Sequence, residues 1–414
     1  MMLLYLLGCV TFSVPEPVTS DTESPLVEDS GDTDTDTDTT GPDTGIDTVD
    51  GEGDPTSEEL FDESRIPDIY LEVSRDGIAA LADEPYEYVE ATLIYEDRRY
   101  GPIALRTKGE NSWRPFSEKS SLKLDFNRYD GGPSRIFGMK GLTLNAMNED
   151  YSMMHERVAY RLYREAGVPA ARAHHAQVYL NGDLYGLFVM LDTVDDVFLE
   201  RWFEDASGSM FEQHDGDYTD AYVQNNLYFQ LEEGEDDRTA LQAVADALES
   251  SGPDAIAAAG EHLDWAAFHR YWAAGSVVMN FDAYPFRFAG DDCHVYFDPT
   301  SQKLVYIPHG VDESFYYNRD IEGTANGHLS ARCREVDACR DDWARAVYDA
   351  LDVADKIDLA GYAREVRDQI EQAVRDDPER NYSLEYVDYY QDDMISRIVS
   401  RRSDIQDHIG SRPN

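Results

Sequence analysis

The chain of 414 residues changes character near residue 64, and this break decides how much of it can form a folded core. Residues 1–64 contain 18 acidic residues and no Lys or Arg, and a bare Asp-Thr repeat runs from Asp32 to Thr39. Like charges without apolar periodicity keep a segment solvated and extended. We therefore predict an acidic linker over residues 10–64 and a folded domain over residues 65–412. A calcium-binding repeat is the alternative, which we disfavour because the repeat lacks the glycine that turns a calcium loop.

A short apolar segment precedes the linker and ends in Leu6-Leu7-Gly8-Cys9. This ending resembles the lipobox of bacterial lipoproteins, in which the cysteine is lipidated after cleavage. We predict that residues 1–9 are such a signal and that the chain meets a membrane only through Cys9. The expected location is extracytoplasmic, as a lipoprotein of a bacterial cell envelope or as a secreted protein. The alternative is a chance apolar N-terminus with a buried cysteine.

The net charge of the chain limits the classes of partner that it can bind. The formal charge is −49, and the part after residue 64 still has 66 acidic against 35 basic residues. Such a chain has no Lys/Arg surplus to attract nucleic acid or anionic lipid, so we expect no nucleic-acid partner. It is not simply disordered, because 42% of its residues are apolar and 12% are aromatic, enough for a large core.

The folded part begins with a pattern typical of strands. Ser121–Phe126 alternates, with Leu122, Leu124 and Phe126 on one side. Further strands are expected at 68–73, 88–95 and 103–106, with a short helical insert at 78–82. A helix is expected at 150–166, followed by a hairpin of strands 176–180 and 184–189 around Asn181-Gly182, a strong hairpin signal.

The second half is predicted to be mostly helical. Helices are expected at 238–250, 264–278, 340–351, 359–375 and 391–409, with one hairpin formed by strands 293–297 and 303–307. The fold class is therefore α+β, with a β-rich N-terminal part and a mainly helical C-terminal part. Cys333 and Cys339 are spaced to close a small loop by a disulfide in an oxidising compartment, which we favour over a zinc site. Cys293 is expected to be free and buried.

Three polar clusters are candidates for chemistry. Arg106-Thr107-Lys108-Gly109 leads on to Ser112 and Lys119, Asn280-Phe281-Asp282 precedes Asp291-Asp292, and the second hairpin ends in Pro308-His309-Gly310-Val311-Asp312. Carboxylates at the ends of a helix and a strand suit Mg²⁺, and a lysine supplies a point charge for phosphates. Phosphoryl transfer needs such a cation clamp, acids that hold a metal and an acid that orients the attacking hydroxyl.

These clusters, together with Leu144–Gly167 and Val178–Val189, occur in the same order as in the CotH kinase family, which is named for spore-coat protein H. The chain resembles this family from about Asp68 to its last helix. The resemblance implies an atypical protein-kinase-like fold with a β-rich N-lobe and a mainly helical C-lobe. It also implies a kinase that uses ATP with Mg²⁺ or Mn²⁺ to phosphorylate Ser/Thr of extracytoplasmic proteins.

The resemblance implies roles for seven residues. Asp282 would accept the proton of the substrate hydroxyl, and Lys119 would contact the nucleotide phosphates. Asp312 and Asp292 would hold the metal. The remaining cofactor-binding residues would be Arg106, Ser112 and Glu156, the last as a partner of Lys119.

The sequence departs from the family pattern at several positions. Gly310 stands where the family commonly has an acid, Asp292 where it usually has Asn, and Asp192 where it usually has Glu. Because Asp312, Asp282 and Lys119 remain, we predict an active kinase. The alternatives are a catalytically inactive surface lipoprotein that binds a partner, and a pseudokinase or nucleotidyl transferase.

Overall fold

The computed structural model describes residues 55–109, 112–286 and 290–413, all within one compact unit that spans Gly45–Asn414. The predicted lipobox at residues 1–9, and the linker as far as residue 54, lie outside the described residues. Among the residues described, no helix combines the length and apolar character that crossing a membrane requires.

The end of the predicted linker is wrong. Helix α1 (Ser57–Leu60) lies inside it and is capped by Thr56, whose side chain accepts a hydrogen bond from the Glu59 backbone N–H while the Glu59 carboxylate bonds the Thr56 N–H. Leu60 and Phe61 are buried in the first hydrophobic core. The chain is therefore part of the fold from Thr56, before the predicted boundary at residue 65, because a capping box and two apolar side chains outweigh the local acidity.

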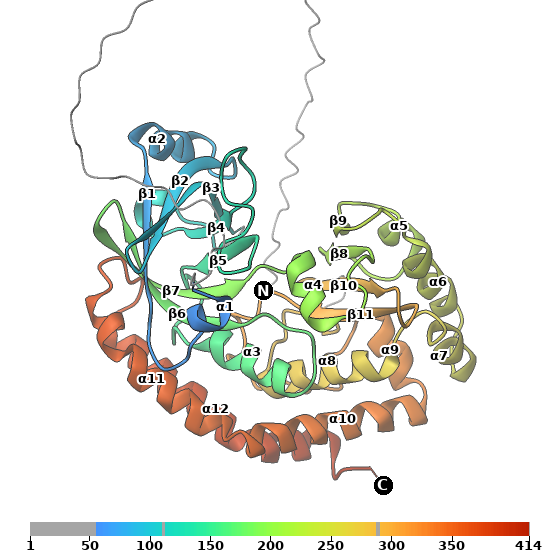
Figure 1. The fold of residues 1–414 in the computed structure, drawn as a ribbon. Coiled ribbons are helices and arrows are strands. Elements are labelled where there is room, and N and C mark those ends of the chain that lie inside the picture. Colours follow the sequence, from blue (N-terminus) through green and yellow to red (C-terminus); the bar gives the residue numbers. More distant parts are fainter. Residues whose placement is uncertain (1–54, 110–111, 287–289, 414) are drawn as a thin grey trace, which may run out of the picture. The chain divides into compact units, whose positions relative to one another are not determined.

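Seven of the described strands close into a barrel, seen in Figure 1 at the blue-to-green end of the chain. Neighbouring strands are antiparallel except β1 and β6, whose parallel pairing closes the barrel. In spatial order the strands are β1 (Asp68–Val73), β2 (Val89–Tyr95), β3 (Arg98–Lys108), β4 (Ser121–Asp125), β5 (Gly141–Asn145), β7 (Asp183–Asp192) and β6 (Ala173–Leu180).

Alternation along these strands decides which side chains fill the barrel. Leu122 and Leu124 of β4 point inward with no exposed surface, as do Leu142 and Leu144 of β5. The residues between them face outward, since successive side chains of a strand lie on opposite faces. The predicted Asn181-Gly182 turn is confirmed: both residues have positive φ and join β6 to β7.

A second, four-stranded sheet has the order β11-β10-β8-β9. The predicted hairpin of β10 (Cys293–Asp298) and β11 (Lys303–Pro308) is confirmed, but it is not isolated, because β10 also pairs with β8 (Met210–Gln213), which pairs with β9 (Phe229–Glu233). Figure 1 shows this sheet flanked on its outer side by α5 (Asp220–Val223), α6 (Thr239–Leu248) and α7 (Pro253–Ala259).

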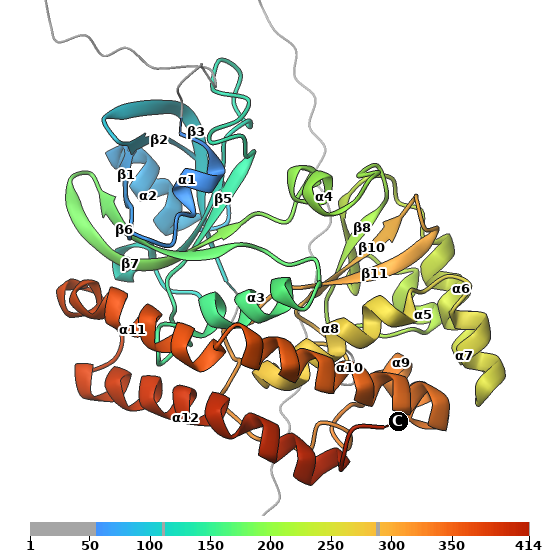
Figure 2. The ribbon, with the colours of Figure 1, turned by 60° about the horizontal axis from the view of Figure 1, so that its bottom comes forward.

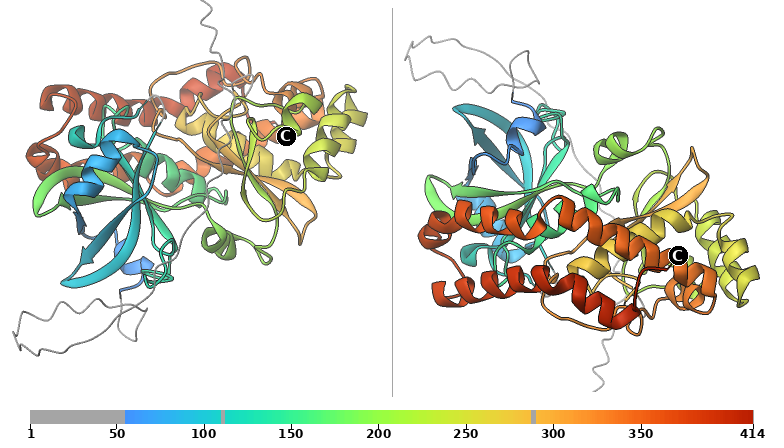
Figure 3. Two further views of the ribbon diagram at one scale, coloured as in Figure 1. Left: turned by 90° about the horizontal axis from the view of Figure 1, so that it is seen from above. Right: turned by 90° about the horizontal axis from the view of Figure 1, so that it is seen from below.

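Long helices run beneath both sheets, as the lower half of Figure 2 and the right-hand view of Figure 3 show. Helix α10 packs along α8, with Trp343 stacked on Trp272 at 4.2 Å between ring centroids, and α12 packs along α11. These helices are α3 (His155–Glu165), α8 (Trp265–Val278), α10 (Asp337–Lys356), α11 (Leu359–Asp376) and α12 (Leu384–Ile409).

The remaining described elements are α2 (Arg75–Asp83), the 3₁₀ turn η1 (Phe116–Glu118), α4 (Asp196–Trp202) and α9 (His328–Arg334). The mixed α+β class is confirmed, and so is the disulfide between Cys333 and Cys339, with Cys293 free and buried. Helix α3 begins five residues later than predicted, because the Asp150 carboxylate accepts the backbone N–H groups of Ser152, Met153 and His155.

Candidate active site

A cavity of about 730 Å³ is lined on one side by the outer face of the barrel and on the other by the second sheet and the loops that follow α8 and β11. It collects most of the charged residues that the sequence singled out. The contributing elements include the strands β3, β4, β5, β7, β8, β9 and β10, the helix α3, and the chain segments around residues 282, 292 and 312.

The barrel wall contributes polar and cationic groups by strand alternation. Lys108 at the end of β3 lies opposite Ser121 of β4, and Arg106 lies opposite Lys123. Lys123 in turn lies opposite Thr143 of β5. Since the intervening residues point into the barrel, these side chains share one outward face and line the cavity. Two lysines and an arginine therefore face the site from adjacent strands.

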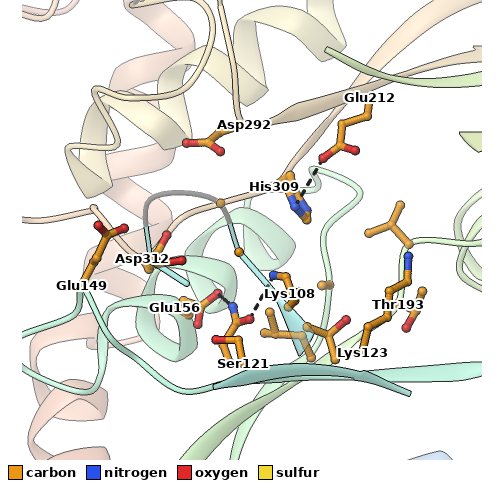
Figure 4. Close-up of a pocket in the computed structure, with 18 of the residues that line it drawn as sticks. Lys108, Ser121, Lys123, Glu149, Glu156, Thr193, Glu212, Asp292, His309 and Asp312 are labelled. Atoms are coloured by element: carbon orange, nitrogen blue, oxygen red, sulfur yellow. Dashed lines mark hydrogen bonds and ion pairs between the residues drawn. The ribbon is translucent and has the colours of Figure 1, made fainter. Parts of the chain in front are cut away.

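Lys108 is linked to helix α3 through an asparagine. Its Nζ donates to Asn145 Oδ1 at 3.1 Å, and Asn145 Nδ2 donates to Glu156 Oε1 at 2.7 Å. Figure 4 shows Lys108 and Glu156 near one another in the cavity, with dashed lines for these hydrogen bonds. Glu156 is 1% exposed, and its second oxygen, Oε2, has no hydrogen-bond partner. An ionised carboxylate oxygen that is buried without a partner is costly, so Glu156 either holds a proton or needs a cation.

Three further carboxylates enter the cavity from chain segments that follow or precede regular elements. Met279, in a left-handed conformation, caps the end of α8, and the turn that follows brings Asp282 to the cavity. Asp292 immediately precedes β10, and Asp312 follows β11. The Asp312 segment is fixed to α3, because the imidazole Nδ1 of His155 lies 2.7 Å from the Asp312 backbone oxygen.

Burial and neighbouring charges raise the pKa values of Glu156, Asp292 and Asp312. Burial, followed by the charge of Asp312, raises the pKa of Glu156 to about 8. Burial and the neighbouring Asp291, Asp282 and Asp312 raise the pKa of Asp292 well above its usual range, and burial raises the pKa of Asp312. Like charges this close disfavour ionisation of one another, and a bound cation reverses that effect.

Gly310 makes the close packing of Asp292 possible. Its φ is +53°, and a Cβ at this position would lie 2.1 Å from Asp292 Oδ1. The Asp292 carboxylate therefore takes the space that a side chain at position 310 would need. The two departures from the family pattern, Gly310 and Asp292, touch each other.

The opposite end of the cavity is rich in histidine. The Glu212 carboxylate lies 3.6 Å from both His214 Nε2 and His309 Nε2, and the His294 ring lies against that of His309. Hydrogen bonds to Asp291 and Glu212 raise the pKa of His214 to about 11, whereas burial lowers the pKa of His309 to about 3. Figure 4 shows Glu212 and His309 on the side of the cavity away from Glu149.

Six of the seven predicted site residues line this cavity: Arg106, Ser112, Glu156, Asp282, Asp292 and Asp312. Lys119 does not, and the role predicted for it conflicts with its position. It caps η1, is 1% exposed, and donates from Nζ to Asp377 Oδ2 at 2.6 Å, at the end of α11. An ammonium group enclosed with a carboxylate is not available to phosphates, and Glu156 is paired through Asn145 with Lys108 instead.

Several residues that line the site were given no role from the sequence, although Lys108 and His309 stand in the candidate clusters: Lys108, Lys123, Asn145, Glu149, Glu212, His214, His294 and His309. The two lysines were recognisable from alternation alone, since Leu122 and Leu124 fix the face on which Lys123 lies. No local pattern brings His214 and His294 together, because β8 and β10 pair only in the folded chain.

The residues present suit a divalent cation and a phosphate-bearing ligand. Carboxylate oxygens are the ligands that Mg²⁺ and Mn²⁺ prefer, and Asp292, Asp312 and the unpartnered Glu156 Oε2 offer them within one cavity. Lys108, Lys123 and Arg106 face them from the barrel wall with charge for phosphate oxygens.

Comparison with known proteins gives a family match over most of the chain. The family described as "CotH kinase protein" matches residues 105–413. An inner spore coat protein H-like protein of Bacillus subtilis (strain 168) is 30% identical over 97 residues, which cover 23% of this chain and 28% of the relative. The aligned part thus spans less than a third of that relative's length.

Two solved structures show weak overall likeness. The proinflammatory kinase CtkA of Helicobacter pylori has a TM-score of 0.31 at 10% identity, covering 79% of this chain and 92% of that one. The Shewanella oneidensis MR-1 complex of HipA, HipB and operator DNA has a TM-score of 0.30 at 10% identity, covering 81% and 82%. Both TM-scores are too low to establish a common fold.

Proposed function

Because the chain belongs to the family of CotH kinase proteins, we propose that it is a protein kinase that transfers the γ-phosphate of ATP to Ser or Thr of extracytoplasmic proteins. The observation that carries the proposal is the placement of Asp282, Asp292, Asp312 and Glu156 opposite Lys108 and Lys123 in one cavity. In this proposal the barrel corresponds to the N-lobe of a kinase, and the helical region with the second sheet corresponds to the C-lobe.

Each group has a defined task in this reaction. Lys108 and Lys123 contact the phosphates, with Arg106 and Ser112 beside them. Asp312 and Asp292 would hold the divalent cation, with Glu156 Oε2 facing the same cavity, and the cation would supply positive charge against the phosphate oxygens. Asp282 accepts the hydroxyl proton as the substrate oxygen bonds to the γ-phosphorus and the bond to the β-phosphate oxygen breaks, releasing ADP.

The decisive assay is transfer of labelled γ-phosphate from ATP, with Mg²⁺ or Mn²⁺, to a generic protein acceptor. We expect transfer by the wild type, and a loss of at least about 100-fold in Asp282→Ala and Asp312→Ala, because each removes a group that acts in the transition state. Asp368→Asn, an exposed acid on α11, is the matched control and keeps wild-type activity.

The proposal is contradicted if the wild-type chain transfers no phosphate with either Mg²⁺ or Mn²⁺. Binding of a protein partner that needs no ATP and survives both alanine substitutions would instead support an inactive surface module. Mass spectrometry of the product separates phosphate transfer from AMP transfer, the outcome expected of a nucleotidyl transferase.

We propose in addition that the kinase is tethered to a cell surface. The acidic segment over residues 10–54 would act as the spacer, and lipidated Cys9 as the anchor. Mass spectrometry of the mature protein from a bacterial membrane fraction tests this directly: a diacylglyceryl cysteine at position 9 is expected, and an unmodified Met1–Cys9 segment contradicts it.

A further inference from the structure

A second cluster of ligating atoms lies in the helical region, away from the cavity. Cys333 of α9 and Cys339 of α10 form a disulfide, and His269 of α8 places its Nε2 atom 3.4 Å from the sulfur of each. All three side chains are buried, with exposures of 0%, 4% and 5%. Three helices therefore meet at two sulfur atoms and one imidazole nitrogen.

These three residues form a compact ligand set. One ligand atom from each lies within 4.8 Å of the other two, and no other group of His, Cys, Asp and Glu in the described part of the chain meets this spacing. The imidazole of His269 is buried and directs its Nε2 atom toward both sulfurs. Two thiolates with one neutral imidazole are ligands that zinc binds, at about 2.3 Å to sulfur and about 2.0 Å to nitrogen.

We propose that, once the Cys333–Cys339 bond is reduced, Cys333, Cys339 and His269 bind one Zn²⁺ ion. With a phosphine as reductant, the phosphine takes the oxygen of one water and becomes the oxide, while the two sulfurs become thiols. Binding of Zn²⁺ then replaces both thiol protons. Water completes the fourth position, since the described chain places three ligands there. The site does not depend on the proposed kinase activity.

The site gives the fold two ways to join the same helices. In the oxidised chain a covalent bond links α9 to α10, and His269 of α8 contacts both sulfurs. In the reduced chain the metal would link all three helices. Since α8 leads directly to Asp282, either link would stabilise the helix that positions this acid.

Cobalt substitution tests the proposal on the full-length chain. Reduced, metal-free protein is titrated with Co²⁺, and the near-ultraviolet absorption from sulfur-to-cobalt charge transfer is recorded. The carboxylates of the cavity do not produce this band, so it reports only on a thiolate site. We expect the band to saturate at one equivalent, to disappear on adding Zn²⁺, and to be absent from the oxidised chain.

Variants identify the ligands. Cys333→Ser and Cys339→Ser should lose the band, and His269→Gln should weaken Zn²⁺ binding at least about 10-fold. Cys293→Ser, which removes the buried cysteine outside the cluster, should keep the band and is the matched control.

Three outcomes overturn the proposal. The first is a reduced, folded wild-type chain without the band, with folding checked by circular dichroism. The second is a band that survives in the Cys333→Ser/Cys339→Ser variant. The third is a reduced chain that loses its helical signal and does not regain it when Co²⁺ is added.

Discussion

Gly310 is the single residue whose small size most affects the proposed metal site. Its left-handed backbone conformation and the 2.1 Å approach of a hypothetical Cβ to Asp292 Oδ1 leave no room for a side chain. We predict that Gly310→Ala displaces the Asp292 carboxylate and lowers phosphate transfer at least about 10-fold, with a loss of about 1 kcal/mol in the free energy of unfolding from the positive φ. Kinetic assays and urea titrations measure the two effects.

The matched control is Gly138→Ala. Gly138 also has a positive φ of 74°, but a Cβ there would meet no atom within 4 Å. It should therefore show the stability loss without the loss of activity. Equal activity in the two variants would show that the contact with Asp292 is unimportant.

Glu156 makes the stability of the metal-free protein depend on pH. Its folded-state pKa of about 8 lies above the ordinary value of 4.5, so the folded state binds more protons than the unfolded state between these two values. The free energy of unfolding consequently falls as pH rises through this window, by up to about 1.4 kcal/mol per pH unit for one group. We predict that Glu156→Gln flattens this slope.

Urea titrations from pH 5 to pH 8, in the presence of a chelator, measure the slope. Glu165→Gln is the control, because Glu165 is an exposed residue of the same helix. An unchanged slope in Glu156→Gln would mean that Glu156 is already ionised in the folded chain.

Among single residues, the acidic members of the site were predicted from the sequence more accurately than the basic ones. Asp282, Asp292 and Asp312 stand beside element ends that the local pattern marked, and all three line the cavity. Lys119 was chosen by its place in a linear motif, but a turn at η1 directs it toward Asp377, which is 258 residues later in the chain. No local pattern reports a partner at that distance.

The Lys119–Asp377 pair joins two elements, the segment before β4 and the end of α11. Asp377 Oδ2 accepts from Lys119 Nζ and from the Leu187 backbone N–H of β7 at 3.0 Å. We predict that Lys119→Met lowers the free energy of unfolding by about 3–5 kcal/mol, because it leaves a buried carboxylate without its cation. Chemical denaturation measures this loss.

Two comparisons make this prediction specific. Lys119→Met/Asp377→Asn should recover much of the lost stability, since no uncompensated charge remains. Lys108→Met should lower phosphate transfer with a smaller effect on stability. A stable Lys119→Met protein with a specific defect in ATP binding would return Lys119 to the role first predicted for it.

Elements with strong local patterns were predicted and the others were not. The β6–β7 hairpin and α8 were found because an Asn-Gly turn marks the first and a largely apolar run marks the second. Strands β8 and β9 are only four and five residues long and owe their conformation to pairing with β10 and with each other. The local alternation of apolar and polar residues does not show which distant segments pair. The sequence therefore predicted only the β10–β11 hairpin of the second sheet.

At the scale of the whole molecule, we expect the proposed cation to stabilise the folded chain by binding in the cavity. The folded part is strongly acidic; burial raises the pKa values of Asp292, Asp312 and Glu156, and the charge of Asp312 adds to the increase for Asp292 and Glu156. A divalent cation that binds only the folded chain stabilises it by about 2.7 kcal/mol at a concentration of 100 Kd. We predict that Mn²⁺ raises the melting temperature, more at pH 8 than at pH 6, because protons compete for the same oxygens.

Thermal melts with and without Mn²⁺ test this coupling. Asp312→Asn should remove most of the shift, whereas Asp368→Asn should keep it. A shift that Asp312→Asn leaves unchanged would place the stabilising ion elsewhere.

The most direct test of the proposed site is a crystal structure of the chain with Mn²⁺ and a non-hydrolysable ATP analogue, with the metal located by its anomalous signal. The result predicted is a manganese peak between Asp312 and Asp292, with phosphate oxygens bonded to Lys108 or Lys123. A metal peak away from these carboxylates, or a nucleotide bound outside the cavity, would contradict the account.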